Sequence, residues 1–239
     1  MVELYRTLAD LQTRIERANA VNIDRNVENY HADISLEELR EVLGEPGLEV
    51  GGMSFTKPSN PRYREPHLFL HPDHRERLVQ HSPLEVGVTR DNVYSVATAV
   101  EEISHWVYSQ QYKQRFGRWG ETAATELIGS VDKCNITCSF PLVGVGEEEI
   151  RRSSFEADQA PFGSPLRTPE YLIAHKLGRG FIEHLDTLGP DAARKMVHAY
   201  HLEDKELLRF LMYDVGLRIP GLEEREEQQV MQHLQDLRI

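Results

Sequence analysis

The sequence predicts an α+β fold that is predominantly helical, with a small sheet placed before a central helix that carries a cluster of ionisable side chains. Apolar residues recur at helical spacing over most of the 239 residues. The stretch from Glu45 to Arg90 departs from that spacing, because prolines and glycines divide it into short apolar runs typical of strands. We therefore expect one globular domain over residues 1–220, with the sheet near residues 45–75, followed by an amphipathic acidic helix over residues 221–239.

Two helices are predicted before the sheet. From Val2 to about Asn19, apolar residues recur every three or four positions and so share one face of a helix. This face consists of Leu4, Leu8, Leu11 and Ile15. A shorter helix is expected from Leu36 to Val42. Its start is marked by Ser35 and Glu38, which have the spacing of a capping box, and Gly44 ends it.

Three short apolar runs predict the strands of the sheet. They are Leu48–Val50, Met53–Phe55 and His67–Leu70. Pro72 and Asp73 predict a turn after the last strand. Three histidines lie near this turn, and we expect them to be incidental surface residues rather than metal ligands; they are His67, His71 and His74.

The central helix is predicted from Asp91 to about Lys113. Its apolar stripe consists of Val93, Val96, Val100, Ile103 and Val107. The polar residues that fall together beside this stripe on a helical wheel are Tyr94, Glu101, His105 and Tyr108. Glu102 lies farther round, toward the polar side. Because burial of a carboxylate without a partner is costly, we expect a cation close to Glu101.

The second half of the chain is predicted to be helical apart from one long loop. A helix is expected over about Gly120–Cys134, followed by a loop over Ser139–Pro169 that is typical of a lid or a binding loop. Another helix is expected over Glu170–Leu188. Two shorter helices are expected after it, at about Asp191–Tyr200 and Lys205–Tyr213. The tail Leu222–Ile239 has an apolar seam, which predicts that the tail docks on the rest of the domain or on a second subunit.

Composition narrows the class of protein and its partners. The net charge of −12 argues against a nucleic acid as the principal partner, because phosphate binding needs a concentrated cationic surface. No run approaches the roughly 18 apolar residues of a membrane span. The first residues lack the order of a secretory signal, and the two cysteines, Cys134 and Cys138, are expected to be partly buried thiols. We therefore expect a cytoplasmic protein with no membrane partner.

The central helix contains the pattern Glu-Glu-x-x-His, formed by Glu101, Glu102 and His105. Residues four apart share a helix face, so Glu101 and His105 can converge on one metal ion. Together with Glu126, the pattern resembles the gluzincin (thermolysin-like) branch of the zincin metallopeptidases, over about Leu68 to Lys133. The resemblance implies that Glu101, His105 and Glu126 hold the ion. It also implies that Glu102 is the catalytic general base.

The ligand set departs from the family's pattern, because Glu101 stands where the family has its first histidine. A set of two glutamates and one histidine suits manganese or iron at least as well as zinc. The helical wheel offers Asp132 as an alternative third ligand, since it flanks the apolar face of its helix whereas Glu126 lies opposite. Glu102 and His105 also match the Glu-x-x-His element of di-iron bundles, but the later helices supply no second pair at that spacing.

Two functions are consistent with this sequence. The first is a metal-dependent hydrolase of degenerate zincin type, using a divalent zinc, manganese or iron ion. The second is a non-catalytic protein that binds a protein or peptide partner. In that case the cluster is an internal ion-pair network, for example Glu101 with Arg179 or Lys176. The broken motif favours the second function, and the polar residues beside the apolar stripe favour the first.

Overall fold

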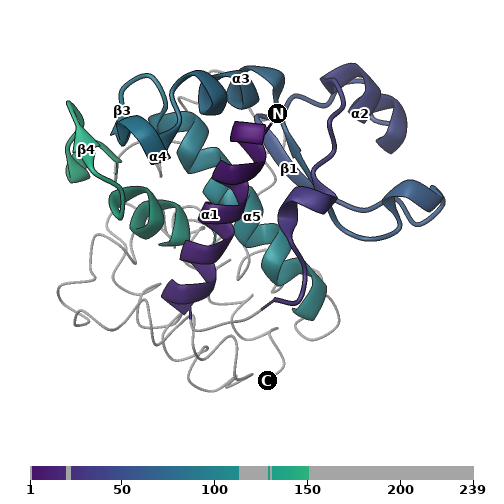
Figure 1. The fold of residues 1–239 in the computed structure, drawn as a ribbon. Helices are drawn as coiled ribbons and strands as arrows, with labels where there is room; N and C mark the ends of the chain where they lie inside the picture. Colours follow the sequence, from purple (N-terminus) through teal and green to yellow (C-terminus); the bar gives the residue numbers. More distant parts are fainter. Residues whose placement is uncertain (1, 20–22, 113–128, 130, 151–239) are drawn as a thin grey trace, which may run out of the picture.

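The structure is a computed structural model that describes residues 2–19, 23–112, 129 and 131–150, with the backbone alone for residues 108–112 (Figure 1). The described part is α+β and mostly helical with a small sheet, as predicted. Its elements are α1 (Val2–Asn19), η1 (Val27–Tyr30), α2 (Leu36–Leu43), β1 (Gly52–Phe55), η2 (Pro61–Tyr63), β2 (His67–Leu70), α3 (Pro72–Gln80), α4 (Pro83–Val86), β3 (Val88–Thr89), α5 (Val93–Tyr112) and β4 (Leu142–Val143). Residues 131–138 and 147–150 are helical as well.

The core forms where α1 and α5 pack against each other, at the centre of Figure 1. The predicted apolar face of α1 is confirmed, because Leu8, Leu11 and Ile15 are fully buried and Leu4 nearly so. The predicted stripe of α5 is confirmed too, with Val96, Val100 and Ile103 completely buried. Burial of each such side chain stabilises the fold by roughly 1.5–3 kcal/mol. These two stripes therefore fix the relative position of the helices.

The capping box predicted for the second helix is confirmed. The hydroxyl of Ser35 accepts a hydrogen bond from the backbone N–H of Glu38, and the carboxylate of Glu38 accepts one from the N–H of Ser35. The helix runs one residue farther than predicted, to Leu43, before Gly44 ends it with a left-handed φ of 75°. These local hydrogen bonds depend only on neighbouring residues, which is why sequence spacing was sufficient to predict them.

The sheet contains two of the three predicted strands. β1 and β2 pair antiparallel, from Gly52 opposite Leu70 to Phe55 opposite His67. The third prediction, Leu48–Val50, is wrong, because this segment is irregular. Its apolar side chains are nevertheless buried in a core shared with α2 and the sheet. The carbonyl of Leu48 accepts a hydrogen bond from the guanidinium of Arg40, which takes the place of a strand partner.

The turn predicted at Pro72 and Asp73 is also wrong, since Pro72 is the first residue of α3. Proline is well suited to that position, because the N–H that it lacks would have no partner in the helix. The ring of His71 accepts a hydrogen bond from the backbone N–H of Asp73 and so caps the helix. Histidine is an unusual cap, so the common cap residues were missing, and Pro72 was the remaining sign of a helix start.

The pair formed by β3 and β4 was not predicted, and β4 lies in the segment Ser139–Pro169 that was expected to be a loop. These two-residue strands are parallel, with Val88 opposite Leu142 and Thr89 opposite Val143. Gly87 precedes them with φ 75°, and a Cβ at this position would lie 2.4 Å from the carbonyl oxygen of Pro141. Strands of this length are too short for an alternating apolar pattern, so sequence periodicity could not have predicted them.

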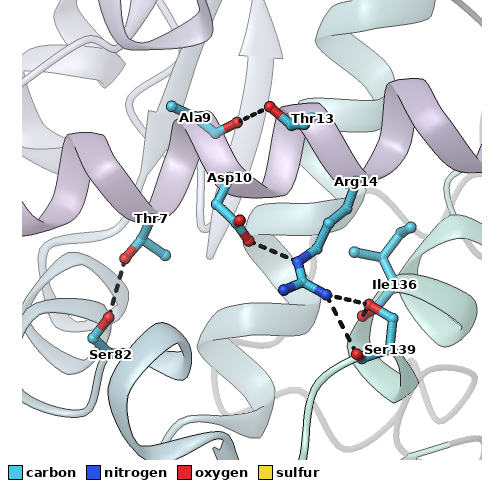
Figure 2. A network of polar contacts seen from close by, with 8 residues as sticks. All are labelled: Thr7, Ala9, Asp10, Thr13, Arg14, Ser82, Ile136 and Ser139. Carbon is cyan, nitrogen blue, oxygen red and sulfur yellow. Dashed lines mark hydrogen bonds and ion pairs between the residues drawn. The ribbon is translucent and has the colours of Figure 1, made fainter.

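Side-chain contacts tie α1 to the segments that pack around it (Figure 2). Asp10 accepts a 2.6 Å hydrogen bond from Nε of Arg14, and Nη1 of Arg14 donates to the hydroxyl of Ser139 at 3.0 Å. The same guanidinium lies 3.9 Å from the ring centroid of Phe140. Nearer the N-terminus of α1, the hydroxyls of Thr7 and Ser82 lie 3.4 Å apart. The polar side of α1 thus holds the chain that follows the 131–138 helix.

Several sequence predictions lie outside the described residues. They concern residues 120–128 with Glu126, the loop from residue 151 to Pro169, the helices over Glu170–Leu188, Asp191–Tyr200 and Lys205–Tyr213, the cations Lys176 and Arg179, and the tail Leu222–Ile239. The described end of the predicted Gly120–Cys134 helix is helical, but it continues to Cys138. Cys134 is buried and Cys138 is partly buried, and they are thiols rather than a disulfide, as predicted.

Candidate functional site

The predicted site lies on the middle of α5, which passes between β1 and the helix that contains residue 129. Glycines allow both neighbours to approach closely. A Cβ at Gly52 of β1 would lie 2.6 Å from Cγ of Glu102. A Cβ at Gly129 would lie 2.6 Å from Nε2 of His105 and 3.6 Å from Cγ of Glu101. The Glu-Glu-x-x-His segment is therefore packed against backbone on two sides.

Glu101 is buried and forms an ion pair with Lys133. Nζ of Lys133 donates a hydrogen bond to Oε2 of Glu101 at 2.7 Å, and each side chain is 11% exposed. The prediction that a cation lies close to Glu101 is thus confirmed. The cation that the structure shows is Lys133, which comes from the helix packed against α5, whereas the predicted Lys176 and Arg179 lie outside the described residues. Burial makes this attraction much stronger than a surface pair in water.

Glu102 and His105 form the second contact of the cluster. Nδ1 of His105 lies 3.6 Å from Oε2 of Glu102, and each side chain is 12% exposed. The two residues are three apart on one helix, so their side chains lie on neighbouring positions of its surface. This contact is an ion pair when the imidazole is protonated. Glu102, predicted to lie toward the polar side, is therefore largely covered.

Asp132 joins three helices through a buried carboxylate that is 1% exposed. The hydroxyl of Ser104 on α5 donates to Oδ2 at 2.6 Å. Nδ2 of Asn19, the last residue of α1, donates to both oxygens at 3.0 and 3.1 Å. Burial raises the pKa of Asp132 from 3.8 to about 6, although the hydrogen bonds from Ser104 and Asn19 and the nearby His105 oppose this shift. The prediction that Asp132 faces inward is confirmed.

The described part of the cluster does not assemble three metal ligands around one point. Within residues 2–19, 23–112, 129 and 131–150, no group of three or more His, Cys, Asp or Glu side chains is arranged to hold a metal ion. Glu101 faces Lys133, and Asp132 faces Ser104 and Asn19. Glu126 lies outside the described residues. Tyr94, predicted to share the helix face of Glu101 and His105, is 50% exposed.

Sequence reasoning missed Lys133, Ser104 and Asn19 as members of the cluster. A signal for two of them was available. Ser104 lies three residues after Glu101, and the consecutive pair Asp132 and Lys133 follows on the next predicted helix. When two helices pack antiparallel, a higher residue number on one helix lies opposite a lower residue number on the other. Glu101 accordingly contacts Lys133, and Ser104 contacts Asp132. Asn19 comes from a distant helix, so no local spacing could have indicated it.

Two of the described histidines outside this cluster are buried. His74 is buried, with Nδ1 2.9 Å from the hydroxyl of Ser95, and burial followed by the charges of His71 and Arg77 lowers its pKa to about 4. His31 is also buried, and burial followed by Arg75 lowers its pKa to about 4. Both rings are therefore neutral at physiological pH.

The third histidine of the predicted surface group, His67, is not an isolated surface residue. Its ring centroid lies 5.0 Å from that of Tyr63 and 5.7 Å from that of Tyr30. Its Nδ1 lies 2.8 Å from the carbonyl oxygen of Glu65. The prediction that His67, His71 and His74 are surface residues is wrong for His74, which is buried.

Comparison of the chain with known proteins adds no family. No protein-family model matches the sequence, and searches of curated proteins and of solved structures found no match either. Among the described helices, none is long and apolar enough to cross a bilayer. The cluster consists of the buried ion pair between Glu101 and Lys133, the contact of Glu102 with His105, and the buried carboxylate of Asp132, which accepts hydrogen bonds from Ser104 and Asn19.

Proposed function

We propose that the protein binds a protein or peptide partner without catalysing a reaction, and that its Glu/His cluster is a structural ion-pair network. The observation that supports this function is the 2.7 Å contact between Nζ of Lys133 and Oε2 of Glu101. A metal ion on that carboxylate would lie beside a full positive charge in a region shielded from water. Repulsion there is far stronger than on an exposed surface.

The second carboxylate supports the same proposal. Asp132 receives three hydrogen bonds, from Ser104 and Asn19, and these occupy three of the roughly four lone-pair positions of an ionised carboxylate. A buried carboxylate with such donors serves to fix the register of the helices around it, which is the best-supported role of buried polar groups. The cluster thus holds α1, α5 and the 131–138 helix in one arrangement.

The charge of the chain limits the class of partner. With a net charge of −12, the protein would repel a polyanion such as nucleic acid over most of its surface. A basic or neutral protein segment is compatible with that charge. We further infer a cytoplasmic location from the two thiols, and assembly with another copy through residues 221–239 from their apolar seam.

The proposal is tested by metal analysis after an attempt at loading. The full chain, purified without an affinity tag, is incubated with zinc, manganese or ferrous iron, desalted and measured by elemental analysis. We expect no stoichiometric metal, and the same result for Glu101→Gln and His105→Ala. One equivalent of bound metal in the wild type that disappears in both variants would rule out the structural account.

A metal-dependent hydrolase is the second candidate, supported by the approach of Glu102 to His105. A carboxylate 3.6 Å from an imidazole on a core-facing helix is an arrangement that a general base and a ligand also require. In this account Glu101, His105 and either Glu126 or Asp132 bind a zinc, manganese or iron ion, and Glu102 removes a proton from water. Hydrolysis of a casein substrate that is lost in Glu102→Gln, together with stoichiometric metal, would favour it.

A further inference from the structure

The segment of residues 23–35, between α1 and α2, contains a buried histidine without a hydrogen-bond partner in the described part of the chain. His31 is 9% exposed, and both of its ring nitrogens lack such a partner among the described residues. The ring of Tyr5 on α1 lies edge-on to it, with the ring centroids 6.1 Å apart. A ring in these surroundings is costly to protonate, because the charge would be buried without a hydrogen-bond acceptor.

The charges beside this ring also disfavour a proton on it. Among the described residues, the titratable and charged groups that face it are Tyr5 from α1, Arg75 from α3 and Asp33 from its own segment. From β2 it meets the apolar residue Leu68, which lies opposite it in a β-bridge. Burial lowers the pKa of His31 to about 4, with a further contribution from Arg75, and Asp33 opposes the shift. Asp33 is paired with Arg75 and is 53% exposed, so its negative charge is partly neutralised and partly screened.

The contact of this segment with the sheet lies at the same place. His31 is opposite Leu68 in an isolated bridge, and the N–H of Ala32 donates to the carbonyl of Leu68 at 2.8 Å. Farther along, Nη2 of Arg75 donates to the carbonyl of Ile34 at 3.0 Å. An isolated bridge lacks the successive hydrogen bonds of a strand ladder. The segment can therefore open locally while the helices around it stay folded.

We propose that residues 27–34 form a pH-sensitive latch, which detaches from β2 and α1 when His31 takes up a proton. Opening hydrates the imidazole and takes it away from Arg75, so the open form binds a proton more tightly than the closed form. The latch is closed at neutral pH, and acidification favours the open form. Opening uncovers the edge of β2 at Leu68 and the buried apolar side chains of Val27 and Ile34. This latch does not depend on the proposed function.

The test is amide hydrogen exchange of the full chain, followed residue by residue by NMR between pH 7.5 and pH 5. The opening constant of the Ala32 amide, corrected for the intrinsic exchange rate, should rise about 30-fold over this range. The reason is that the ring binds its proton with a pKa of 6.5 in the open form and about 4 in the closed form. Leu11, buried in the core of α1, reports global unfolding. The Ala32 constant should exceed the Leu11 constant at least about tenfold at every pH.

Two variants assign the effect to one imidazole. In His31→Phe, the pH dependence of the Ala32 opening constant should disappear, and His31→Gln replaces this variant if it does not fold. His74→Gln is the matched control, because His74 is also buried with a pKa lowered to about 4, and it should keep the 30-fold rise. Equal opening constants for Ala32 and Leu11 in the wild type, a pH-independent Ala32 constant, or an unchanged rise without the imidazole of His31 would each overturn the inference.

Discussion

The ammonium group of Lys133 lies 2.7 Å from the carboxylate of Glu101, and both side chains are almost completely buried. The two residues belong to helices that pack against each other, so the pair joins α5 to the 131–138 helix. A buried pair of this kind does not necessarily stabilise a fold more than apolar residues would, because both charges lose their hydration. We infer that its role is to specify the packing of the two helices, since a shift in register would separate the two charges.

Removal of one member of this pair should therefore be strongly destabilising. In Lys133→Met, Glu101 loses the ammonium group of Lys133, and the free energy of unfolding should fall by about 3–5 kcal/mol. The double variant Lys133→Met with Glu101→Gln should recover most of that loss, because the uncompensated charge is gone. Urea unfolding of the wild type, both single variants and the double variant measures the coupling. A double variant as unstable as Lys133→Met would contradict the charge-pair explanation.

Asp132 should make the protein less stable as the pH rises from about 4 to about 6. Its pKa is about 6 in the folded protein against 3.8 ordinarily, so the folded state holds the proton more tightly than the unfolded chain. The stabilising contribution of the protonated form is complete below about pH 4 and is lost as the pH passes 6. At pH 7 the loss amounts to roughly 3 kcal/mol.

Asp132→Asn is the comparison that isolates this effect. The amide cannot ionise, so the stability of this variant relative to the wild type should increase by roughly 3 kcal/mol between pH 4 and pH 7. Any change in hydrogen bonding to Ser104 or Asn19 adds an offset that does not depend on pH. Urea unfolding at several pH values would show the slope, and a difference that is constant across this range would argue against the raised pKa.

His31 should produce the opposite trend. Burial lowers its pKa to about 4 from 6.5, so the unfolded state binds the proton more tightly. The stabilising contribution of the neutral ring is complete above pH 6.5 and is lost as the pH falls toward 4, by roughly 3 kcal/mol. His31→Phe should remove that loss. Tyr5→Phe is the control, because the ring of Tyr5 lies 6.1 Å from that of His31 (between centroids) and His31 itself is unchanged. This variant should still lose stability as the pH falls.

Gly129 should be intolerant of even the smallest side chain. A Cβ at this position would lie 2.6 Å from Nε2 of His105, so Gly129→Ala must displace the imidazole or separate the helices. We expect a loss of about 1–3 kcal/mol, the usual cost of overpacking. Gly146→Ala is a matched control, because nothing lies within 4 Å of its added Cβ. Thermal unfolding of the two variants provides the test, and equal melting temperatures would show that the close approach is unimportant.

The sequence predicted those features of the fold that depend on neighbouring residues. The bounds of α1, the capping box of Ser35 and Glu38, and the apolar stripe of α5 were all predicted correctly. One failure occurred where a distant contact decided the outcome, since residues 48–50 have the composition of a strand but lack a strand partner. The other was local, since α3 begins with an unusual histidine cap.

For the candidate site, the sequence by itself determined that Glu101 would need a cation, because a charge beside an apolar stripe cannot be buried alone. Only the tertiary structure decided that the cation is Lys133 and that Asp132 is held by Ser104 and Asn19. The reason is physical: periodicity fixes which face of a helix is buried, whereas the partner of a buried charge depends on how separate helices pack, and that is encoded in contacts between residues far apart in the chain.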